Sequence, residues 1–338
     1  MLEGGQINAK VLEILSDGKF HSGESLGRAL GISRTAVWKQ LQKLESMGLQ
    51  LESVKGKGYR LPRDFELLNE KKIIGYLTPT VQNQLKTLQI HQSLDSTNRV
   101  ATEEIQQSQS DTAGATGTII MSEYQSNGRG RRGKHWVSPF ASNIYLSLIW
   151  GFDNGANALQ GLSLSIGVAV KRALTELGVE AVSLKWPNDI YVNEKKLGGI
   201  LLEMVGDPAG QCSVIIGIGI NVAMPSESGQ AIDQQWTDVR SSVRKPVSRN
   251  RLAAFVVENC FNLLADYEQK GFAAYREEWQ ASDAFKGRQG AVSSATQSTT
   301  GTILGVDNSG ALKMQLGNGE VAHFIGGELG LRSNDGGD

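Results

Sequence analysis

The sequence has few cysteines, no long hydrophobic run and almost no net charge, and each absence narrows its function. Cys212 and Cys260 stand singly among apolar neighbours, which predicts buried, reduced thiols and a cytoplasmic protein. No apolar run approaches the ~20 residues of a transmembrane helix, and the N-terminus MLEGGQINAK lacks a signal-peptide pattern, so we expect no membrane association. The net charge of −1 confines any nucleic-acid binding to a module that is basic by itself.

The chain of 338 residues is long enough for two or three domains, and its beginning has a helix-turn-helix pattern. Apolar residues recur at helical spacing from Ile7 to Leu15. A second short helix is expected between Ser22, which can cap it, and Gly31, which can end it. A tight turn then leads to Ser33 and the helix RTAVWKQLQKLESMG. The inner stripe of this third helix consists of Val37, Leu41 and Leu44.

A wing is expected next, because two short strands flank the glycine hairpin KGKG. Residues 1–63 hold ten Lys and Arg against six Asp and Glu, a balance of +4, so the remaining residues sum to −5. A solvated helix face is the simpler explanation, but helix order, turn, capping serine and wing together favour a winged helix-turn-helix that binds DNA. Residues 62–68 are expected to be the linker. The expected DNA contacts are Arg34, Thr35, Trp38, Lys39, Lys55 and Lys57.

The stretch SNGRGRRGKHW, residues 126–136, contains the dinucleotide-binding spacing G-x-G-x-x-G, yet three of its other positions are arginines. A dinucleotide site needs a strand that runs directly into the first glycine and a helix that opens at the third. Here QSN separates the expected strand TGTIIMSEY from Gly128, and KHWVSPFASN cannot begin an amphipathic helix. Glycine amides and guanidinium groups favour a site for another anion, a carboxylate or phosphate. A solvated flexible loop is the simpler alternative.

Four further segments carry polar residues or glycines near the ends of expected strands. LDSTN covers residues 94–98, and KWPND, residues 185–189, precedes a hairpin that leads to Lys196 and the glycine pair at 198–199. VIIGIGINV is an apolar strand that is expected to end in a turn over Gly217 to Asn221, and GGEL lies near the C-terminus. Taken singly, each segment is also explained as an ordinary turn or buried strand.

In this order, STN, EYQSNGRGRRGKHWVSPFASNIYLS, KWPNDIYVNEKKLGGIL and GIGIN resemble the biotin protein ligase family. With the winged head in front, the chain is similar to the bifunctional members, which also repress the biotin operon. The resemblance implies a biotin–[acetyl-CoA-carboxylase] ligase that activates biotin with Mg²⁺–ATP and passes it from biotinoyl-AMP to a lysine of biotin carboxyl carrier protein. It also implies biotinoyl-AMP as corepressor and a homodimer when the adenylate is bound.

The resemblance further implies roles for individual residues, because joining a carboxylate to a phosphate depends on positive charge. The catalytic residues would be Lys196, Arg131 and Asp189, with no metal fixed by the protein and Mg²⁺ near Asp189. The biotin-binding residues would be Ser96, Thr97, Asn98, Gln125, Arg129, Gly130, Arg131 and Lys196. The adenylate-binding residues would be Arg131, Arg132, Trp136, Lys185, Asn188, Asn221 and Trp236. A purely structural role stays open for both tryptophans.

The implied fold is a multidomain α/β (α+β) protein. A winged helix-turn-helix would cover residues 1–63, and a central mixed sheet with helices, related to class II aminoacyl-tRNA synthetases, would cover residues 69–283. An SH3-like small β-barrel would cover residues 284–338, where short strands alternate with turns. Periodicity predicts central helices over Asn157 to Leu177 and Arg249 to Gln269.

Three alternatives to this function stay open. A repressor could bind biotin or an adenylate as a signal without ligase activity, and a related acyl ligase could act on lipoate. Lys313 in ALKM looks like the acceptor lysine of the biotin carrier itself. The alternation of ALKMQL between two turns, however, predicts an ordinary outward strand residue at this position.

Overall fold

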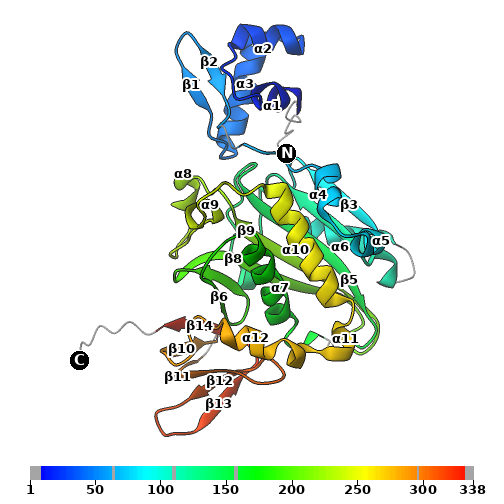
Figure 1. Cartoon of the computed structure of the whole chain (residues 1–338), viewed down its shortest axis with the longest axis vertical. Coiled ribbons are helices and arrows are strands. Elements are labelled where there is room, and N and C mark those ends of the chain that lie inside the picture. The colour runs from blue at the N-terminus through cyan, green and yellow to red at the C-terminus, as the bar shows by residue number, and fades with distance from the viewer. Residues whose placement is uncertain (1–8, 63–64, 109–111, 156–158, 295–296, 332–338) are drawn as a thin grey trace, which may run out of the picture.

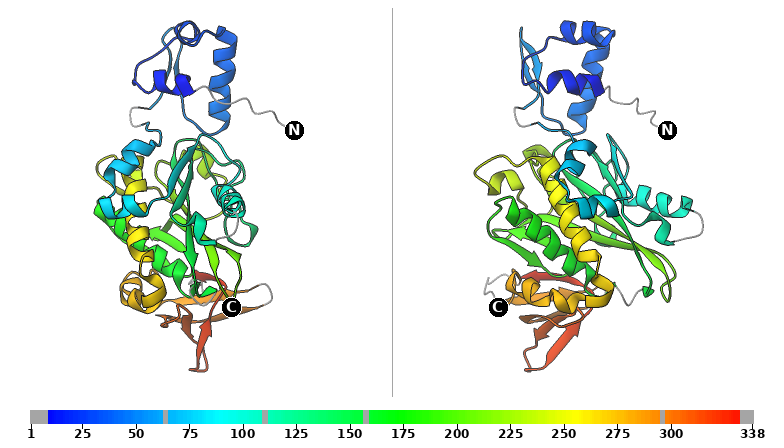
Figure 2. Two further views of the ribbon diagram at one scale, coloured as in Figure 1. Left: turned by 90° about the vertical axis from the view of Figure 1, so that its right-hand side faces the viewer. Right: turned by 45° about the vertical axis from the view of Figure 1, so that its right-hand side comes forward.

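Three parts of the chain are stacked end to end, with a helical head at one end and a small sheet at the other (Figures 1 and 2). The structure is a computed structural model that describes residues 9–62, 65–108, 112–155, 159–294 and 297–331. Within these residues, every helix is too short or too polar to span a membrane.

The head is a helix-turn-helix followed by a two-stranded wing. Its elements are α1 (Ala9–Leu15), α2 (Gly23–Leu30), α3 (Arg34–Ser46), β1 (Glu52–Val54) and β2 (Gly58–Arg60). The side chains of Ser22 and Ser33 cap α2 and α3, because they accept hydrogen bonds from the backbone N–H groups of Ser25 and Ala36. The predicted caps, turn and wing are therefore confirmed, while Ile7 lies outside the described residues.

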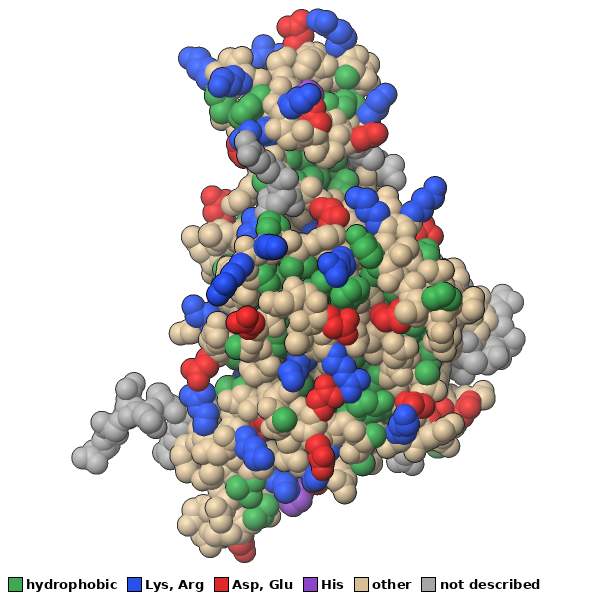
Figure 3. Space-filling view, in the orientation of Figure 1, with side chains coloured by type: hydrophobic (Ala, Val, Ile, Leu, Met, Phe, Trp, Pro, Cys, Tyr) green, Lys and Arg blue, Asp and Glu red, His purple; other side chains and the backbone are tan. Residues whose placement is uncertain are grey.

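The residues predicted to contact DNA lie on the outer surface of the head. The N-terminal half of α3 and the turn between β1 and β2 carry all of them, and all are exposed: Arg34, Thr35, Trp38, Lys39, Lys55 and Lys57. The Trp38 side chain is 47% exposed, although an indole usually avoids water. Several Lys and Arg side chains project from the head (Figure 3). The predicted inner stripe of α3 is fully or almost fully buried: Val37, Leu41 and Leu44.

A seven-stranded mixed sheet forms the centre of the molecule, in the order β3-β4-β5-β9-β8-β7-β6. The strands are β3 (Thr87–His91), β4 (Thr118–Ser122), β5 (Asn143–Phe152), β6 (Val182–Lys185), β7 (Asp189–Val192), β8 (Lys195–Gly206) and β9 (Cys212–Asn221). β3 and β4 run parallel, and the other neighbours are antiparallel. Alternate residues of β9 point to opposite faces, so one sheet can hold a core on one side and a site on the other.

Helices cover the two faces of this sheet unequally. α7 (Leu162–Glu176) and α10 (Arg249–Leu264) pack on one face, against apolar side chains such as Leu146 and Ile216. α6 (Thr97–Gln107) covers only part of the other face, against Ile120 and Ile215. The shorter helices are α4 (Glu70–Tyr76), α5 (Pro79–Gln84), α8 (Ser226–Gly229), α9 (Val239–Ser242), α11 (Tyr267–Lys270) and α12 (Arg276–Ala281), with 3₁₀ turns η1 (Thr112–Ala115), η2 (Arg131–Gly133) and η4 (Phe272–Ala274).

Both predicted central helices are present, with shorter bounds. The helix predicted over Asn157 to Leu177 begins at Leu162, because Gly161 has φ 70° and leaves the helical region. Asn157 itself lies outside the described residues. The helix predicted to reach Gln269 ends at Leu264, and the chain changes direction before it forms the separate helix α11.

The turn predicted over Gly217 to Asn221 is wrong, because this segment continues strand β9. Gly219 pairs with Tyr145 of β5 on one side and with Gly199 of β8 on the other. A strand between two long partners has its backbone groups satisfied along its whole length, so glycines do not interrupt it here. Because these glycines have no side chains, other residues can lie directly against the backbone of the sheet at this point.

The C-terminal part is an antiparallel sheet of five strands in the order β13-β12-β11-β10-β14. Its strands are β10 (Gln289–Ser293), β11 (Ser298–Val306), β12 (Leu312–Gln315), β13 (Val321–Phe324) and β14 (Glu328–Leu331). Lys313 lies inside β12 and pairs with His323 of β13, not at the tip of a hairpin. The predicted strands and the strand position of Lys313 are confirmed.

The linker, predicted over residues 62–68, is bound tightly to the central part. Arg249 at the start of α10 donates to the carbonyl oxygen of Glu66 at 2.7 Å and pairs with Glu123 at 2.8 Å. Glu123 also accepts a hydrogen bond from the backbone N–H of Leu68 at 2.6 Å. The Arg249 and Glu123 side chains are only 5% and 3% exposed, so these extra hydrogen bonds offset the loss of hydration. The described part of the linker is therefore held in one position.

The end of α3 also docks on the central part. The backbone N–H of Phe140 donates to the carbonyl oxygen of Met47 at 2.8 Å, and the buried Phe140 ring joins the apolar core of the head. Gly48 has φ 88°, and a Cβ atom there would lie 2.7 Å from Cβ of Pro139 and 3.1 Å from Oγ of Ser228. Glycine satisfies both the backbone angle and the close approach.

We expect Gly48→Ala to lower the free energy of unfolding by about 2 kcal/mol, because alanine is strained at positive φ and its methyl group would displace Pro139. Urea unfolding monitored by tryptophan fluorescence measures the change. The matched control is Gly75→Ala in α4, where a methyl group meets open space and should raise stability slightly. Equal stabilities of Gly48→Ala and the unchanged protein would contradict the close contact.

Candidate active site

A cavity of about 650 Å³ opens on the face of the central sheet that α7 and α10 do not cover. Gly217 and Gly219 line it, while the alternate residues Ile216 and Ile220 belong to the core on the other face. Its walls come from the glycine–arginine loop, the KWPND turn, a segment after α8 and the C-terminal sheet. These wall residues are 129–131, 134–137, 185–189, 231–234, 236, 291, 293, 329 and 330. Residues 126–134, which include the first of these wall segments up to Lys134, are called the arginine loop below.

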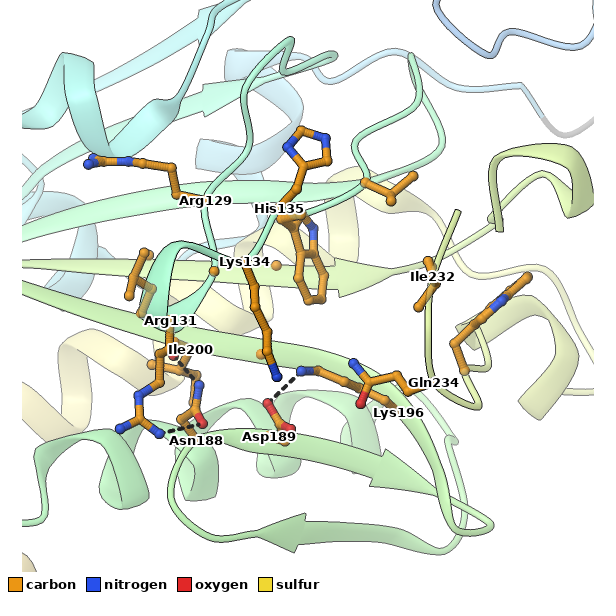
Figure 4. Close-up of a pocket in the computed structure, with 18 of the residues that line it drawn as sticks. Arg129, Arg131, Lys134, His135, Asn188, Asp189, Lys196, Ile200, Ile232 and Gln234 are labelled. Atoms are coloured by element: carbon orange, nitrogen blue, oxygen red, sulfur yellow. Dashed lines mark hydrogen bonds and ion pairs between the residues drawn. The ribbon is translucent and has the colours of Figure 1, made fainter. Parts of the chain in front are cut away.

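An ion pair between Lys196 and Asp189 lies in this cavity. Nζ of Lys196 is 2.7 Å from Oδ1 of Asp189, and the side chains are 16% and 13% exposed. The β7–β8 hairpin brings them together, since Asp189 pairs with Gly199 and Lys196 with Tyr191. Lys134 points from the arginine loop toward this pair (Figure 4). Because charges attract more strongly where water is scarce, the two cations suit an anionic ligand group.

Trp136 lies flat on a glycine surface next to this pair. A Cβ atom at Gly219 would come within 2.6 Å of the indole ring, and one at Gly199 would come within 3.5 Å. Nζ of Lys196 lies 5.7 Å from the ring centre, in a cation–π arrangement. The indole Nε1 atom is buried without a hydrogen-bond partner among the described residues. An unpartnered buried donor facing a cavity suits a ligand acceptor.

The KWPND turn supplies polar groups to the cavity. Asn188 is held by a hydrogen bond from its Nδ2 to the carbonyl oxygen of Ile200, at 2.8 Å. Its Oδ1 accepts from Arg131, whose guanidinium also donates to the carbonyl oxygen of Gly327 at 3.4 Å (Figure 4). The peptide bond between Trp186 and the following proline is cis. Arg131 thereby ties the arginine loop to the KWPND turn and to the C-terminal sheet.

Lys185, the first residue of KWPND, is packed between two aromatic rings. Its Nζ lies 5.4 Å from the ring centres of both Tyr191 and Phe285 and donates to the Tyr191 hydroxyl at 3.3 Å. Burial raises the pKa of Tyr191, so the hydroxyl stays neutral and does not pair with the ammonium as an anion. The aromatic faces hold the positive charge at the cavity wall without neutralising it.

The STN segment forms the polar end of the cavity. Ser96 is buried there, and the backbone N–H of Thr97 donates to Oε1 of Gln125 at 2.8 Å. Nε2 of Gln125 donates to Oγ of Ser138 at 3.1 Å. Asn98 is 4% exposed and bonds to residues outside this group. Buried polar groups joined in this way keep fixed directions, as recognition of a polar ring requires.

The arginine loop forms a tight turn. No long helix follows its third glycine, and this agrees with the prediction from the sequence. The backbone N–H of Gly130 donates to the carbonyl oxygen of Lys134 at 2.7 Å. Arg132, which the family resemblance assigns to the adenylate, has φ 54°, is exposed and does not line the cavity. Arg129 points away from the centre of the cavity and pairs with Glu203 at 2.9 Å (Figure 4).

The other residues suggested from the sequence meet in this one cavity, although the DNA-contact residues lie apart on the head. Its lining includes Ser96, Thr97, Asn98, Gln125, Arg129, Gly130, Arg131, Trp136, Lys185, Asn188, Asp189, Lys196, Asn221 and Trp236. Sequence reasoning missed Lys134 and the wall at residues 231–234. Lys134 stands inside a recognised motif and could have been included. The wall has no motif and reaches the cavity only because Trp236 forms an isolated β-bridge with Lys196.

Comparisons with known proteins agree with this geometry. A model of the biotin/lipoate A/B protein ligase family matches residues 90–221, and a model of an HTH domain matches residues 8–60. The bifunctional ligase/repressor BirA of Escherichia coli K12 is 36% identical over 332 residues, which are 98% of this chain and 99% of that protein. The chain belongs to the biotin protein ligase family. The predicted resemblance to bifunctional ligase/repressors is confirmed.

Other members of the biotin protein ligase family are also similar. The biotin–[acetyl-CoA-carboxylase] ligase of Paracoccus denitrificans is 33% identical over 57% of this chain and 82% of its own length. The biotin protein ligase of Aquifex aeolicus, solved with biotin and ATP, matches with a TM-score of 0.60 at 27% identity. That match covers 73% of this chain and 99% of the Aquifex chain, so about a quarter of this chain lies outside the match.

One carboxyl group behind the KWPND turn of this biotin protein ligase family member is in an unfavourable place. Asp283 forms a β-bridge with Leu184, where the C-terminal sheet joins the central one. Its Oδ1 accepts from the backbone N–H of Phe285, but its Oδ2 is buried without a partner among the described residues. Burial raises the pKa of Asp283 to about 6.

We expect this carboxyl group to make stability fall as pH rises from about 4 to 7. In this range the folded protein binds a proton at Asp283 that the unfolded chain has already lost, so higher pH favours unfolding. Asp283→Asn should remove this contribution to the pH dependence of the free energy of unfolding. The stability of the variant relative to the unchanged protein should therefore rise by about 2 kcal/mol between pH 4 and 7. Urea unfolding at pH 4, 5, 6 and 7 measures it. Parallel profiles for the two proteins would contradict the assignment.

Proposed function

We propose that this chain joins biotin to ATP, forming biotinoyl-AMP, and then transfers biotin to a lysine of the biotin carboxyl carrier protein of acetyl-CoA carboxylase. The observation that carries the proposal is the Lys196–Asp189 pair in a cavity lined by Arg and Lys side chains. The names of the similar proteins from E. coli, Paracoccus and Aquifex support the same substrates.

The first step brings two anions together. The carboxylate of biotin attacks the α-phosphorus of ATP, and pyrophosphate leaves. Because the reactants repel each other, catalysis depends on their orientation and on cations held in place beforehand. In the proposal Lys196 and Arg131 contact the reacting carboxylate and phosphate, and Lys185 contacts the phosphates from the opposite wall. These three residues come from different elements that the sheet and the C-terminal part hold together.

Two ends of the cavity suit the two halves of the intermediate. Its polar end suits the ureido ring of biotin, and Oδ1 of Asn221 is a buried acceptor without a described partner that suits an amino group of the adenine base. The proposed biotin-binding residues are Ser96, Thr97, Asn98, Gln125, Arg129, Gly130, Arg131 and Lys196. The proposed adenylate-binding residues are Arg131, Trp136, Lys185, Asn188, Asn221 and Trp236. The exposed Arg132 is left out of this set.

Asp189 has two proposed uses. It neutralises Lys196 before the anions arrive, and it is free to orient Mg²⁺ or the incoming lysine once Lys196 turns to the ligand. The described residues contain no group of three or more metal-ligating side chains. One carboxylate suits Mg²⁺ that arrives with ATP, since this ion is commonly held by one or two carboxylates together with substrate phosphates. When bound, Mg²⁺ would neutralise phosphate charge.

In the second step the amine of the carrier lysine attacks the acyl carbon of biotinoyl-AMP. AMP leaves, a proton is released and an amide forms. Incubation with ATP, Mg²⁺, labelled biotin and carrier protein tests both steps together. Label on the carrier excludes a repressor that only senses the ligand, and replacing biotin by lipoate in parallel excludes a lipoate ligase.

We expect Lys196→Gln to fold normally and to slow biotinoyl-AMP formation by a factor of about 10²–10³, because one preorganised charge is lost in the transition state. Single-turnover measurement with saturating biotin and ATP gives the rate. Lys195→Gln is the matched control, since Lys195 is exposed on the same strand and does not line the cavity. An unchanged rate in Lys196→Gln would refute its catalytic role.

We also propose that the head represses transcription and that the chain has three domains. A winged helix-turn-helix covers residues 1–63, a catalytic domain related to class II aminoacyl-tRNA synthetases covers 69–283, and an SH3-like barrel covers 284–338. The exposed basic face of α3 supports operator binding, and the five-stranded antiparallel sheet supports the barrel. The buried thiols of Cys212 and Cys260 are free, which supports a cytoplasmic location.

A homodimer completes the proposed repressor. One winged head covers only one operator half-site, and a chain with net charge −1 has little non-specific attraction to DNA. The arginine loop carries several like charges next to the cavity, and biotinoyl-AMP supplies the opposite charge. We therefore propose that the adenylate stabilises the loop, that the stabilised loop completes a dimer surface, and that the dimer binds the operator.

We expect biotinoyl-AMP to shift the protein from monomer to dimer and to tighten operator binding in parallel, because ligand binding and assembly are reciprocally linked. Sedimentation with and without the adenylate measures the shift. Gly130→Ser should weaken the shift, since its Cβ would lie 3.2 Å from the carbonyl oxygen of Lys134. Gly317→Ser, where the side chain meets open space, is the control. A monomer–dimer equilibrium that ignores the adenylate would refute the proposed switch.

A further inference from the structure

One carboxylate oxygen joins two parts of the site that are far apart in the sequence. Oε2 of Glu203 accepts a hydrogen bond from Nδ2 of Asn98 at 2.6 Å and from Nη2 of Arg129 at 2.9 Å. Glu203 lies on β8, Asn98 in the first turn of α6, and Arg129 at the start of the arginine loop. The side chains of Arg129 and Glu203 are 38% and 32% exposed, while Asn98 is buried.

The amide group of Asn98 is held in one orientation by its neighbours. Its Oδ1 accepts a hydrogen bond from Oγ of Ser147 at 2.6 Å, while its Nδ2 donates to Glu203. A Cβ atom at Gly217 would overlap the amide, so the sheet is hollowed at that position to admit it. Glu203 and Ser147 therefore settle which side of the Asn98 amide faces which way.

The same carboxylate sets where the arginine loop begins. The guanidinium of Arg129 points away from the Lys196–Asp189 pair, toward β8, and Glu203 neutralises it there (Figure 4). Arg131, only two residues later, extends in a different direction and reaches Asn188. An ionised acceptor makes stronger hydrogen bonds than a neutral one, so replacing the carboxylate by an amide weakens both contacts at once.

We propose that Glu203 is a positioning residue that fixes the polar end of the cavity and the start of the arginine loop together. It reaches biotin only through Asn98 and Arg129, and this inference rests on the proposed binding of biotin between them. Losing the charge of Glu203 releases both groups, so the affinity for biotin falls. The chemical step is almost unaffected, because Lys196, Arg131 and Asp189 keep their own partners.

The test is Glu203→Gln, which keeps the shape of the side chain and removes its charge. We expect the Kd for biotin alone, measured by calorimetry, and the KM for biotin to rise about tenfold, as one charge-assisted hydrogen bond in a partly exposed position predicts. The kcat for biotinoyl-AMP formation should change less than about threefold. The control is Glu103→Gln on α6, which removes an exposed pair with Arg99 and should leave the Kd and both kinetic constants unchanged.

A double-mutant cycle with Arg129→Gln identifies the route of the effect. Arg129→Gln should also raise the Kd for biotin. The double variant should show a smaller effect than the sum of the two single effects, because both substitutions remove the Arg129–Glu203 pair and only Glu203→Gln also weakens the contact to Asn98. Arg129 is partly exposed in a loop, so its single variant tests the contact even if Glu203→Gln does not fold.

Three results would overturn the inference. They are an unchanged Kd and KM for biotin in Glu203→Gln, additive effects of the two substitutions, or a fall in kcat without a rise in KM. These are distinct from failure of the proposed function, in which the unchanged protein itself binds no biotin. If the unchanged protein binds no biotin, both the proposed function and the inference that rests on it are refuted.

Discussion

Repulsion between like charges is the constraint on which the site depends. Five Lys and Arg side chains line one cavity, and positive charges gathered in one place repel each other. Four of these cations have a different kind of partner in the fold. The partners are Asp189 for Lys196, Glu203 for Arg129, amide and carbonyl oxygens for Arg131, and aromatic rings for Lys185. A ligand with a carboxylate and phosphates can replace these partners with its own negative charge. The cavity is therefore suited to anions, because its positive side chains have partners that an anionic ligand can replace.

The glycines of the sheet are what make room for this arrangement. Gly199 and Gly219 are neighbours across β8 and β9, and together they let the indole of Trp136 lie directly on the backbone. A Cβ atom at Gly219 would overlap the indole and displace Trp136, whereas one at Gly199 would only come into contact with it. The sheet thus forms the floor of the cavity and also sets its depth.

Local patterns in the sequence predicted much of this structure. Ser22 and Ser33 were recognisable as caps because a cap involves residues only three positions apart. The cavity residues were found because the family resemblance covers their segments. Arg132 does not line the cavity although Arg131 does, and the sequence does not reveal the positive φ of Arg132 that distinguishes the two residues. Glu203 and the wall at 231–234 could not be found from spacing, because strand register and chain return bring them to the site.

The contact between the head and the central part also has an evolutionary consequence. Phe140 completes the apolar core of the head, and the same short loop carries Trp136 in the cavity wall. A substitution in this loop can therefore affect the packing of the head and the shape of the cavity together. A DNA-binding head from another protein, joined at the same linker, would need a residue that fits the close approach at Gly48 and an apolar surface that covers the Phe140 ring. The head and the central part are therefore fitted to each other and cannot be exchanged freely as modules.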